Sequence, residues 1–328
     1  MPQGKTHFNE VREVELVGTL LHSLGKCKTS MVANPEIRRV VVNPTGTQSW
    51  KVAHGRSIAL HDGVLMAIIN VTPDSFSDGG RLQTTMDAVS HALACVAEGA
   101  HILDIGGEST KPGAEEVSAE EEQARVLPVI EALSLQTNAF ISIDTYRAST
   151  ARLAVEAGAH IINDVHGAQR EPEIARVAAE LGAGLCLMHT GRGREKLPDV
   201  IDDQMLFLKQ SLKIAGDAGV PPEAVVLDPG FGFAKDADEN IALMVRFAEL
   251  HRLGYPLLAG TSRKRFIGTM TGEEQADRRD AGTAATTTYL RQKGAAVFRV
   301  HNVAINRDAL AVGNAILAAE ARLSPNRT

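Results

Sequence analysis

Residues 139–165, AFISIDTYRASTARLAVEAGAHIINDV, contain the repeating unit of this chain. Two short apolar runs, AFISIDT (139–145) and HIINDV (160–165), flank a segment with apolar residues at helical spacing that ends near Gly158. A glycine is expected just past the end of a helix. Continuous apolar strands are typical of a parallel sheet that is covered on both faces. The stretch therefore predicts a strand–helix–strand unit.

The same rhythm extends in both directions from about residue 63 onward. The other expected strands are VLMAIINV (64–71), HILDIGG (101–107), GLCLMHT (184–190), AVVLDPG (224–230), PLLAGTS (256–262) and AVFRVHN (296–302). One of the helices between them begins at Ser118, with Glu121 at the spacing of a capping box. Eight strand–helix units in about 260 residues predict an α/β fold of the (β/α)8 TIM-barrel type. The alternative is a doubly wound sheet, which usually has a GxGxxG turn after its first strand, and this turn is missing here.

The first part of the chain does not follow the rhythm. We interpret residues 1–60 as an N-terminal extension of unknown role, for which the bottom of the barrel is one possible place, and residues 61–325 as the barrel domain. No apolar run is long enough to span a membrane, and the N-terminus lacks the apolar stretch of a signal peptide. We therefore expect a cytoplasmic protein without a membrane partner.

Composition limits the possible functions further. The chain has 328 residues, of which 44% are hydrophobic, enough for a sizeable core. A net charge of −6 argues against broad nucleic-acid binding, because the phosphate backbone requires a basic face. The three cysteines, Cys27, Cys95 and Cys186, are scattered and odd in number, which fits a reducing compartment better than a disulfide framework.

The end of every predicted strand carries polar side chains. They are Asn70, Asp104, Asp144, Asn163, His189, Asp228, the Ser262–Arg263–Lys264 trio, Arg299 and His301. Each alone has a plainer interpretation, since an aspartate often caps the next helix and a lone histidine is often a satisfied core residue. Together they would meet at one rim, because TIM barrels build their active sites at the carboxyl ends of the strands.

These residues divide by chemistry. Asp144, Asn163 and Asp228 are hydrogen-bonding groups on neighbouring units. The last two strands carry a cationic cluster, which consists of Arg263, Lys264, Arg299 and His301. Phosphate sites of TIM barrels commonly lie in this last region. Phe231 and Phe233 in the glycine-rich DPGFGF loop are suited to stacking on a flat ring. The rim therefore predicts a heterocyclic ligand with an anionic group at one end.

Taken together, the motifs resemble the dihydropteroate synthase family over roughly residues 60 to 320. The motifs are NVTPDSFSDGG, DIGGESTKPGA, SIDT, IINDV, LDPGFGF, SRK and RVH, in this order. The resemblance implies an enzyme that joins 4-aminobenzoate to the methylene group of a dihydropterin diphosphate and releases diphosphate with the help of Mg²⁺. It also implies a homodimer.

The resemblance assigns roles to individual residues. Asp228, Asn163 and Asp144 would bind the edge of the pterin, and Lys264 would donate to its acceptor atoms. Phe233 and Ser262 would also contact substrate, Arg299 and His301 would bind the diphosphate, and Asn70 would be a metal ligand. An amide oxygen suits Mg²⁺, which usually keeps most of its waters.

The resemblance also implies two mobile loops, NVTPDSFSDGG and GGESTKPGA, that close over the site and exclude water. Asp78 would stabilise positive charge on the pterin methylene. Phe76, Thr110 and Pro112 would form the wall of the aminobenzoate pocket.

The sequence departs from the common family pattern at two positions. Lys111 stands where many relatives have arginine, which removes a bidentate fork. Arg265 stands where a small serine is frequent, and it would either bind the aminobenzoate carboxylate or point away. Two alternative functions remain open: methyl transfer from methyltetrahydrofolate to a corrinoid, and a non-catalytic pterin-binding paralogue. The first would not need SRK together with RVH, and the second would be expected to lose loop or anion-binding residues.

Overall fold

The predicted barrel is present in a computed structural model, which describes residues 49–72, 80–108 and 116–323. Eight parallel strands form one sheet in the order β8-β7-β6-β5-β4-β3-β10-β9. They are β3 (Val64–Asn70), β4 (Ile102–Gly106), β5 (Phe140–Asp144), β6 (Ile161–Asp164), β7 (Gly184–Met188), β8 (Val225–Asp228), β9 (Leu258–Ala259) and β10 (Val297–Val300). The edge strands β8 and β9 are joined by a parallel bridge between Leu227 and Leu257, which closes the ring. The fold prediction is confirmed.

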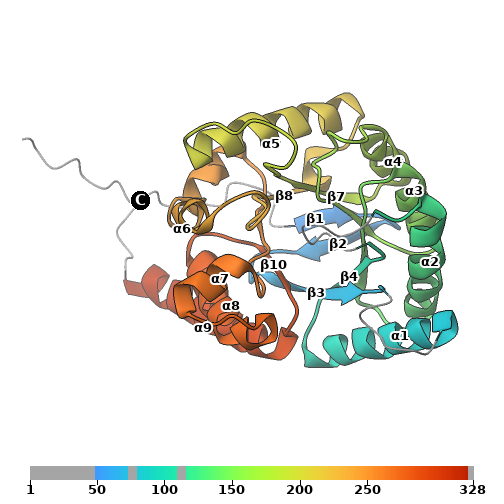
Figure 1. Cartoon of the computed structure of the whole chain (residues 1–328), viewed down its shortest axis with the longest axis horizontal. Helices are drawn as coiled ribbons and strands as arrows, with labels where there is room; N and C mark the ends of the chain where they lie inside the picture. The colour runs from blue at the N-terminus through green and yellow to red at the C-terminus, as the bar shows by residue number, and fades with distance from the viewer. Residues whose placement is uncertain (1–48, 73–79, 109–115, 324–328) are drawn as a thin grey trace, which may run out of the picture. The chain divides into compact units, whose positions relative to one another are not determined.

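Helices surround this ring (Figure 1). They are α1 (Gly80–Glu98), α2 (Ala119–Gln136), α3 (Ala148–Glu156), α4 (Glu173–Leu181), α5 (Val200–Asp217), α6 (Ala237–Val245), α7 (Arg265–Thr271), α8 (Asp280–Gln292) and α9 (Val303–Leu323). Within the described ranges, three 3₁₀ helices, η2 (Pro222–Ala224), η3 (Phe247–Leu253) and η4 (Ala276–Arg279), supplement them. As predicted, Ser118 caps α2, and its hydroxyl accepts a hydrogen bond from Glu121 N at 3.2 Å. Gly158, just past α3, has a φ of +117°.

The register of the strands arranges the barrel interior in layers. Inward-facing positions alternate along each strand. A lower layer is apolar and includes Met66, Ile102, Cys186, Val226 and Val297. Two positions further along, β4, β8 and β10 carry Asp104, Asp228 and Arg299, whereas β3 and β7 carry Ile68 and Met188. The interior therefore changes from an apolar floor to a partly polar layer toward the mouth.

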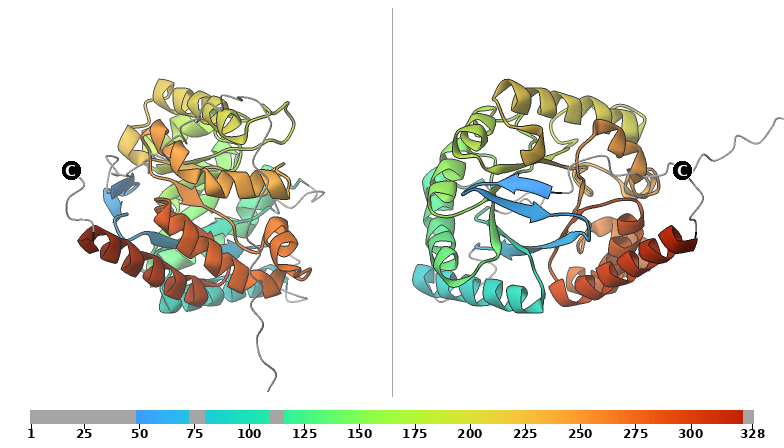
Figure 2. Two further views of the ribbon diagram at one scale, coloured as in Figure 1. Left: turned by 90° about the vertical axis from the view of Figure 1, so that its left-hand side faces the viewer. Right: turned by 180° about the vertical axis from the view of Figure 1, so that it is seen from behind.

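A short hairpin covers the apolar end. Strands β1 (Ser49–Val52) and β2 (Arg56–Ala59) pair antiparallel, and the view from behind shows them across one end of the ring (Figure 2). Trp50 is fully buried, and its indole N–H donates to Ala224 O at 2.8 Å. A Cβ built at Gly184, where β7 begins, would lie 2.8 Å from Val52 Cγ1, so the hairpin packs closely on the amino-terminal ends of the strands. The boundary at residue 60 stays a prediction.

Two further sequence expectations concern helices and cysteines. In the described part of the chain, no helix is both long enough and apolar enough to cross a membrane. Cys95 and Cys186 are free thiols and both are buried. Burial raises the pKa of the Cys186 thiol well above its ordinary value, so this group is a core residue and not a nucleophile.

Candidate active site at the barrel mouth

The base of the site is a buried ionic network. Asp104 is fully buried, and its Oδ2 accepts hydrogen bonds from Asn163 Nδ2 at 3.0 Å and from Arg299 Nε at 2.6 Å. Arg299 Nη2 donates to Asp144 Oδ2 at 2.6 Å. Asp104 was noted as a strand-end residue, but the sequence assigned it no role. Through these hydrogen bonds it orients Asn163 and Arg299.

The charges of this network strongly affect each other. Burial raises the pKa of Asp144 to about 7, although the attraction of Arg299 opposes the shift. Burial also disfavours charge on Arg299, but Asp104 and Asp144 outweigh it and keep the pKa of the guanidinium above its ordinary value. Asp144 can therefore either accept or donate a hydrogen bond near neutral pH.

Asp228 and Lys264 face each other across Gly260. A Cβ built at Gly260 would lie 3.6 Å from Asp228 Oδ2 and 3.9 Å from Lys264 Nζ. Asp228 Oδ1 accepts a hydrogen bond from Gly230 N at 2.7 Å, and Lys264 Nζ donates to Phe231 O. Burial lowers the pKa of Lys264 to about 8 and raises that of Asp228, while each charge favours the other. The missing side chain at Gly260 leaves room for a ligand that contacts both groups.

One small cavity joins most of the predicted pterin-binding residues, although Asp144 is not part of its lining. Its lining consists of Asn163, Val165, Met188, Asp228, Phe233, Gly260, Lys264 and Arg299. Phe233 contributes an aromatic face, with Lys264 Nζ 4.7 Å and Arg192 Cζ 4.6 Å from the ring centroid. The structure thus brings these sequence-predicted residues together. The contributions of Val165, Met188 and Gly260 were missed, because apolar and small residues next to a polar motif give no signal of their own.

Ser262 and His301 form a second pair at the mouth. Ser262 Oγ lies 2.9 Å from His301 Nδ1 and accepts a hydrogen bond from His301 N at 3.1 Å. Burial and then the positive charges of Arg263 and Arg299 lower the pKa of His301 to about 3. His301 is therefore neutral at pH 7. A bound anion would either carry the proton of their hydrogen bond itself or raise the pKa of His301 through its negative charge.

Asn70, the predicted metal ligand, ends β3 and is exposed. A Cβ built at Gly106 would lie 4.0 Å from Asn70 Oδ1 and 3.8 Å from Asp144 Oδ2, so both oxygens border the same glycine. Within the described ranges, no group of three His, Cys, Asp or Glu side chains could hold a metal alone. An amide oxygen next to substrate phosphates still fits Mg²⁺, which binds proteins through few ligands.

Three expectations from the rim motifs were wrong. Arg263 does not join the cationic cluster, because its guanidinium pairs with Asp280 of α8 at 2.7 Å. Phe231 is fully buried and stacks on Phe247 and Phe266, so it belongs to the core. The side chain of His189 is fully buried and contacts Asp203 of α5. Arg265, at the start of α7, is exposed.

Several predicted residues lie outside the described residues. These are Phe76, Asp78, Thr110 and Pro112, together with Lys111. The roles assigned to them, and to the other site residues, stay predictions.

Comparison with known proteins defines the class. The model of the pterin binding enzyme family matches residues 66–301, and the chain therefore belongs to this family. Within it, a dihydropteroate synthase of Bacillus subtilis is 48% identical over 240 residues, which cover 73% of this chain and 84% of the relative.

Solved structures point to the same enzyme. A Xanthomonas albilineans dihydropteroate synthase with 4-aminobenzoic acid matches with a TM-score of 0.78 and 44% identity, over 82% of this chain and 99% of that one. Another structure of that species' enzyme, in complex with 7,8-dihydropteroate, matches with a TM-score of 0.75 and 42% identity, over the same shares of the two chains. The member of the family that this chain matches is dihydropteroate synthase.

Proposed function

We propose that this chain condenses 4-aminobenzoate with (7,8-dihydropterin-6-yl)methyl diphosphate and forms 7,8-dihydropteroate and diphosphate. It is a transferase with dihydropteroate synthase activity. The observation that carries the reaction in this structure is the convergence of Asp228, Lys264 and Asn163 on one cavity at the carboxyl ends of the strands. This position is where TIM barrels bind and convert their substrates.

The pterin end of the substrate fits the carboxylate and the ammonium group. A pterin edge carries a ring N–H beside an exocyclic amine, and a carboxylate accepts from both at once. Asp228 is the carboxylate that borders the Gly260 gap, and Lys264 lies beside it as the donor for pterin acceptor atoms. Asn163 is held by Asp104, so its amide is oriented before a ligand arrives.

The reaction itself needs little acid–base help. The C–O bond between the methylene carbon and the diphosphate breaks, and its electron pair leaves with the diphosphate. The lone pair of the neutral aniline nitrogen forms the new C–N bond, and the nitrogen then releases a proton to solvent. Arg299 and His301 are the proposed diphosphate ligands, and the role of Asp78 is electrostatic. When bound, Mg²⁺ at Asn70 would neutralise charge on the leaving diphosphate.

One assay tests this function. The purified chain is incubated with the dihydropterin diphosphate, 4-aminobenzoate and Mg²⁺, and dihydropteroate is quantified. Product that requires all three supports the synthase. Methyl transfer to a corrinoid, or pterin binding without product, would favour one of the two alternatives. A homodimer in a cytoplasmic setting is the proposed state of the enzyme, and sedimentation equilibrium checks the dimer.

A further inference from the structure

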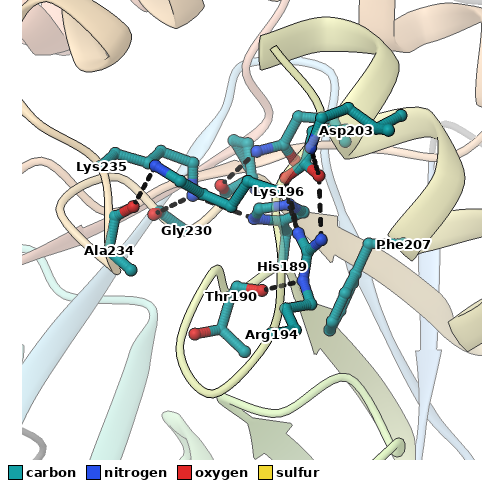
Figure 3. Close-up of polar contacts among 12 residues, drawn as sticks. His189, Thr190, Arg194, Lys196, Asp203, Phe207, Gly230, Ala234 and Lys235 are labelled. Carbon is teal, nitrogen blue, oxygen red and sulfur yellow. Dashed lines mark hydrogen bonds and ion pairs between the residues drawn. The ribbon is translucent and has the colours of Figure 1, made fainter. Parts of the chain in front are cut away.

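A buried polar network connects the segments that follow β7 and β8 (Figure 3). Met188 lines the cavity, and the next residue, His189, points in the opposite direction because side chains alternate along a strand. His189 Nδ1 lies 2.9 Å from Lys235 Nζ, and its Nε2 lies 2.9 Å from Asp203 Oδ2. Neither His189 nor Lys235 is part of the cavity lining.

His189 lies among two cations and one carboxylate. Its Nε2 is close not only to Asp203 but also to Arg194 Nη2, at 2.8 Å, and Asp203 accepts two hydrogen bonds from Arg194, at 2.9 and 2.5 Å. Burial lowers the pKa of His189 to about 4, which keeps the ring neutral, with one donor and one acceptor nitrogen. A ring protonated on Nε2 accepts from the Lys235 ammonium at Nδ1 and donates to Asp203, and Arg194 then donates to Asp203 alone.

Lys235 holds the loop that carries the pterin residues. Besides His189, its ammonium donates to Gly230 O at 2.9 Å and to Phe233 O at 3.4 Å. Gly230 and Gly232 have φ values of +65° and +77°, and the non-glycine Ala234 has +51°. The two glycines adopt this conformation without strain, whereas Ala234 is retained in it only where the surroundings fix it.

The loop also lies directly against the backbone of β7. A Cβ built at Gly230 would lie 1.9 Å from His189 O, and His189 N donates to Asp228 O at 2.8 Å. His189 therefore touches the loop with its backbone as well as through Lys235. Any shift of this contact would move Asp228, whose Oδ1 accepts from Gly230 N.

Folding stability alone does not favour an ammonium at this position. Burial and the nearby charge of Lys264 lower the pKa of Lys235 to about 7. Replacing a buried charge by an apolar side chain of similar size is often neutral or stabilising. The carbonyl contacts of Lys235 therefore point to the geometry of the loop and not to the stability of the barrel.

We propose that Lys235 and His189 are positioning residues that set the loop between β8 and α6, and with it Asp228 and Phe233, for pterin binding. The proposal rests on the proposed function. It assigns a role in the known reaction to two residues that are not part of the cavity lining.

The first test compares two lysines of the same loop. Lys235→Met removes the three contacts at nearly constant volume. Lys196→Met is the matched control, because Lys196 Nζ also donates to a carbonyl of the loop, Ala234 O at 2.8 Å, but does not contact His189.

Affinity is measured by calorimetry with 6-hydroxymethyl-7,8-dihydropterin. We expect Lys235→Met to bind at least about tenfold more weakly with an unchanged or higher melting temperature, and Lys196→Met to bind like the wild type. Equal affinity of Lys235→Met and the wild type would overturn the proposal.

The second test is a rescue at His189, which also decides the question if Lys235→Met does not fold. Asparagine places an amide oxygen near the position of Nδ1 and can accept from Lys235, whereas leucine cannot. We expect His189→Asn to retain more pterin affinity than His189→Leu, and equal affinities of the two variants would refute the positioning role. The wild-type assay for dihydropteroate is run in parallel. A wild type that binds pterin but forms no product contradicts the proposed function, whereas an active wild type with unaffected variants contradicts only this inference.

Discussion

At the scale of single residues, Asp228 combines a structural and a binding role. Its Oδ1 accepts from the backbone of its own loop, and its Oδ2 borders the Gly260 gap beside Lys264. An ionised carboxylate can serve both, because each oxygen accepts more than one hydrogen bond. An amide cannot, since one of its two ends is a donor.

Asp228→Asn should therefore weaken pterin binding. Either the amide nitrogen faces Gly230 N, or it faces Lys264 and the donor edge of the pterin. A buried mismatch of this kind costs about 1–3 kcal/mol, which corresponds to roughly tenfold or more in affinity. Calorimetry with a dihydropterin measures the change. Unaltered affinity would remove Asp228 from the site.

Asp144 gives a prediction for the pH dependence of stability. Its ordinary pKa is 3.8, and burial raises the folded value to about 7. Between these values the folded state binds more protons than the unfolded state, so this residue makes stability fall as pH rises from about 4 to 7. Arg299, Asp104, Glu122 and Asp164 are the charges that act on it. In Asp144→Asn this loss should be absent.

The corresponding experiment is urea unfolding of both proteins at pH 4.5 and pH 8. We expect the variant to gain about 1–3 kcal/mol relative to the wild type between these two pH values. Parallel stability curves would show that Asp144 is ionised with an ordinary pKa in the folded protein.

The sequence predicted which residues form the site better than where each side chain points. Strand ends gave the position of Asp228, Asn163 and Lys264, because parallel strands end at one rim. Arg263 was assigned to the wrong group, since its φ of +56° turns it toward Asp280, and no local pattern indicates this conformation. The pairing of Arg299 with Asp104 joins residues 195 positions apart, so it depends on the closed barrel.

At the scale of secondary-structure elements, the hairpin β1–β2 closes the apolar end of the barrel. Trp50, Val52 and Ile58 belong to the same buried cluster as the lower layer of the strands. No strands were assigned to residues 1–60 from the sequence, and the sequence did not indicate the pairing of β1 with β2. The turn between them uses positive φ at His54 and Gly55, and a histidine in that conformation is hard to foresee.

Trp50→Ala tests the contribution of this hairpin. The substitution removes a fully buried indole and its hydrogen bond to Ala224 O, and we expect a loss of about 3–5 kcal/mol in the free energy of unfolding. Lys51→Ala is the control, because its ion pair with Glu223 is on the surface and should contribute little to the free energy of unfolding. Because the hairpin lies at the end opposite the mouth, the KM values of folded Trp50→Ala should stay normal. Equal stability of the two variants would mean that the hairpin is not part of the folded core.

The eight strands themselves were predictable because each is a short apolar run with a helical pattern after it. The predicted α2 cap was also confirmed, because capping involves residues only three positions apart and can be recognised in the local sequence. Strand β9 is shorter than the others, with only two residues. Its pairing with β10 and the bridge of Leu257 to Leu227 keep it in the sheet.

At the scale of the whole barrel, the mouth balances its charges internally. Arg299 reaches from β10 to Asp104 on β4 and Asp144 on β5, and it thus links three strands of the ring. Two functions are compatible with this position: an internal ion pair that stabilises the barrel, and an anion ligand that exchanges a carboxylate for the diphosphate. The ion pairs themselves are seen in the structure, and the binding of the diphosphate is the sequence-based prediction.

Arg299→Lys separates these two functions. Lysine keeps the positive charge between the two carboxylates but loses the planar fork that fits phosphate oxygens. Complete removal of the charge, as in Arg299→Met, would leave two buried carboxylates unpaired and cost about 3–5 kcal/mol, so loss of activity there would not be informative.

The lysine variant should melt close to the wild type. Its affinity for the dihydropterin diphosphate should fall by roughly tenfold, whereas its affinity for 6-hydroxymethyl-7,8-dihydropterin should barely change. The ratio of these two affinities, measured on the same preparation with its melting temperature, is the decisive quantity. If the ratio in Arg299→Lys equals that of the wild type, Arg299 is a structural residue of the barrel and the diphosphate is bound elsewhere.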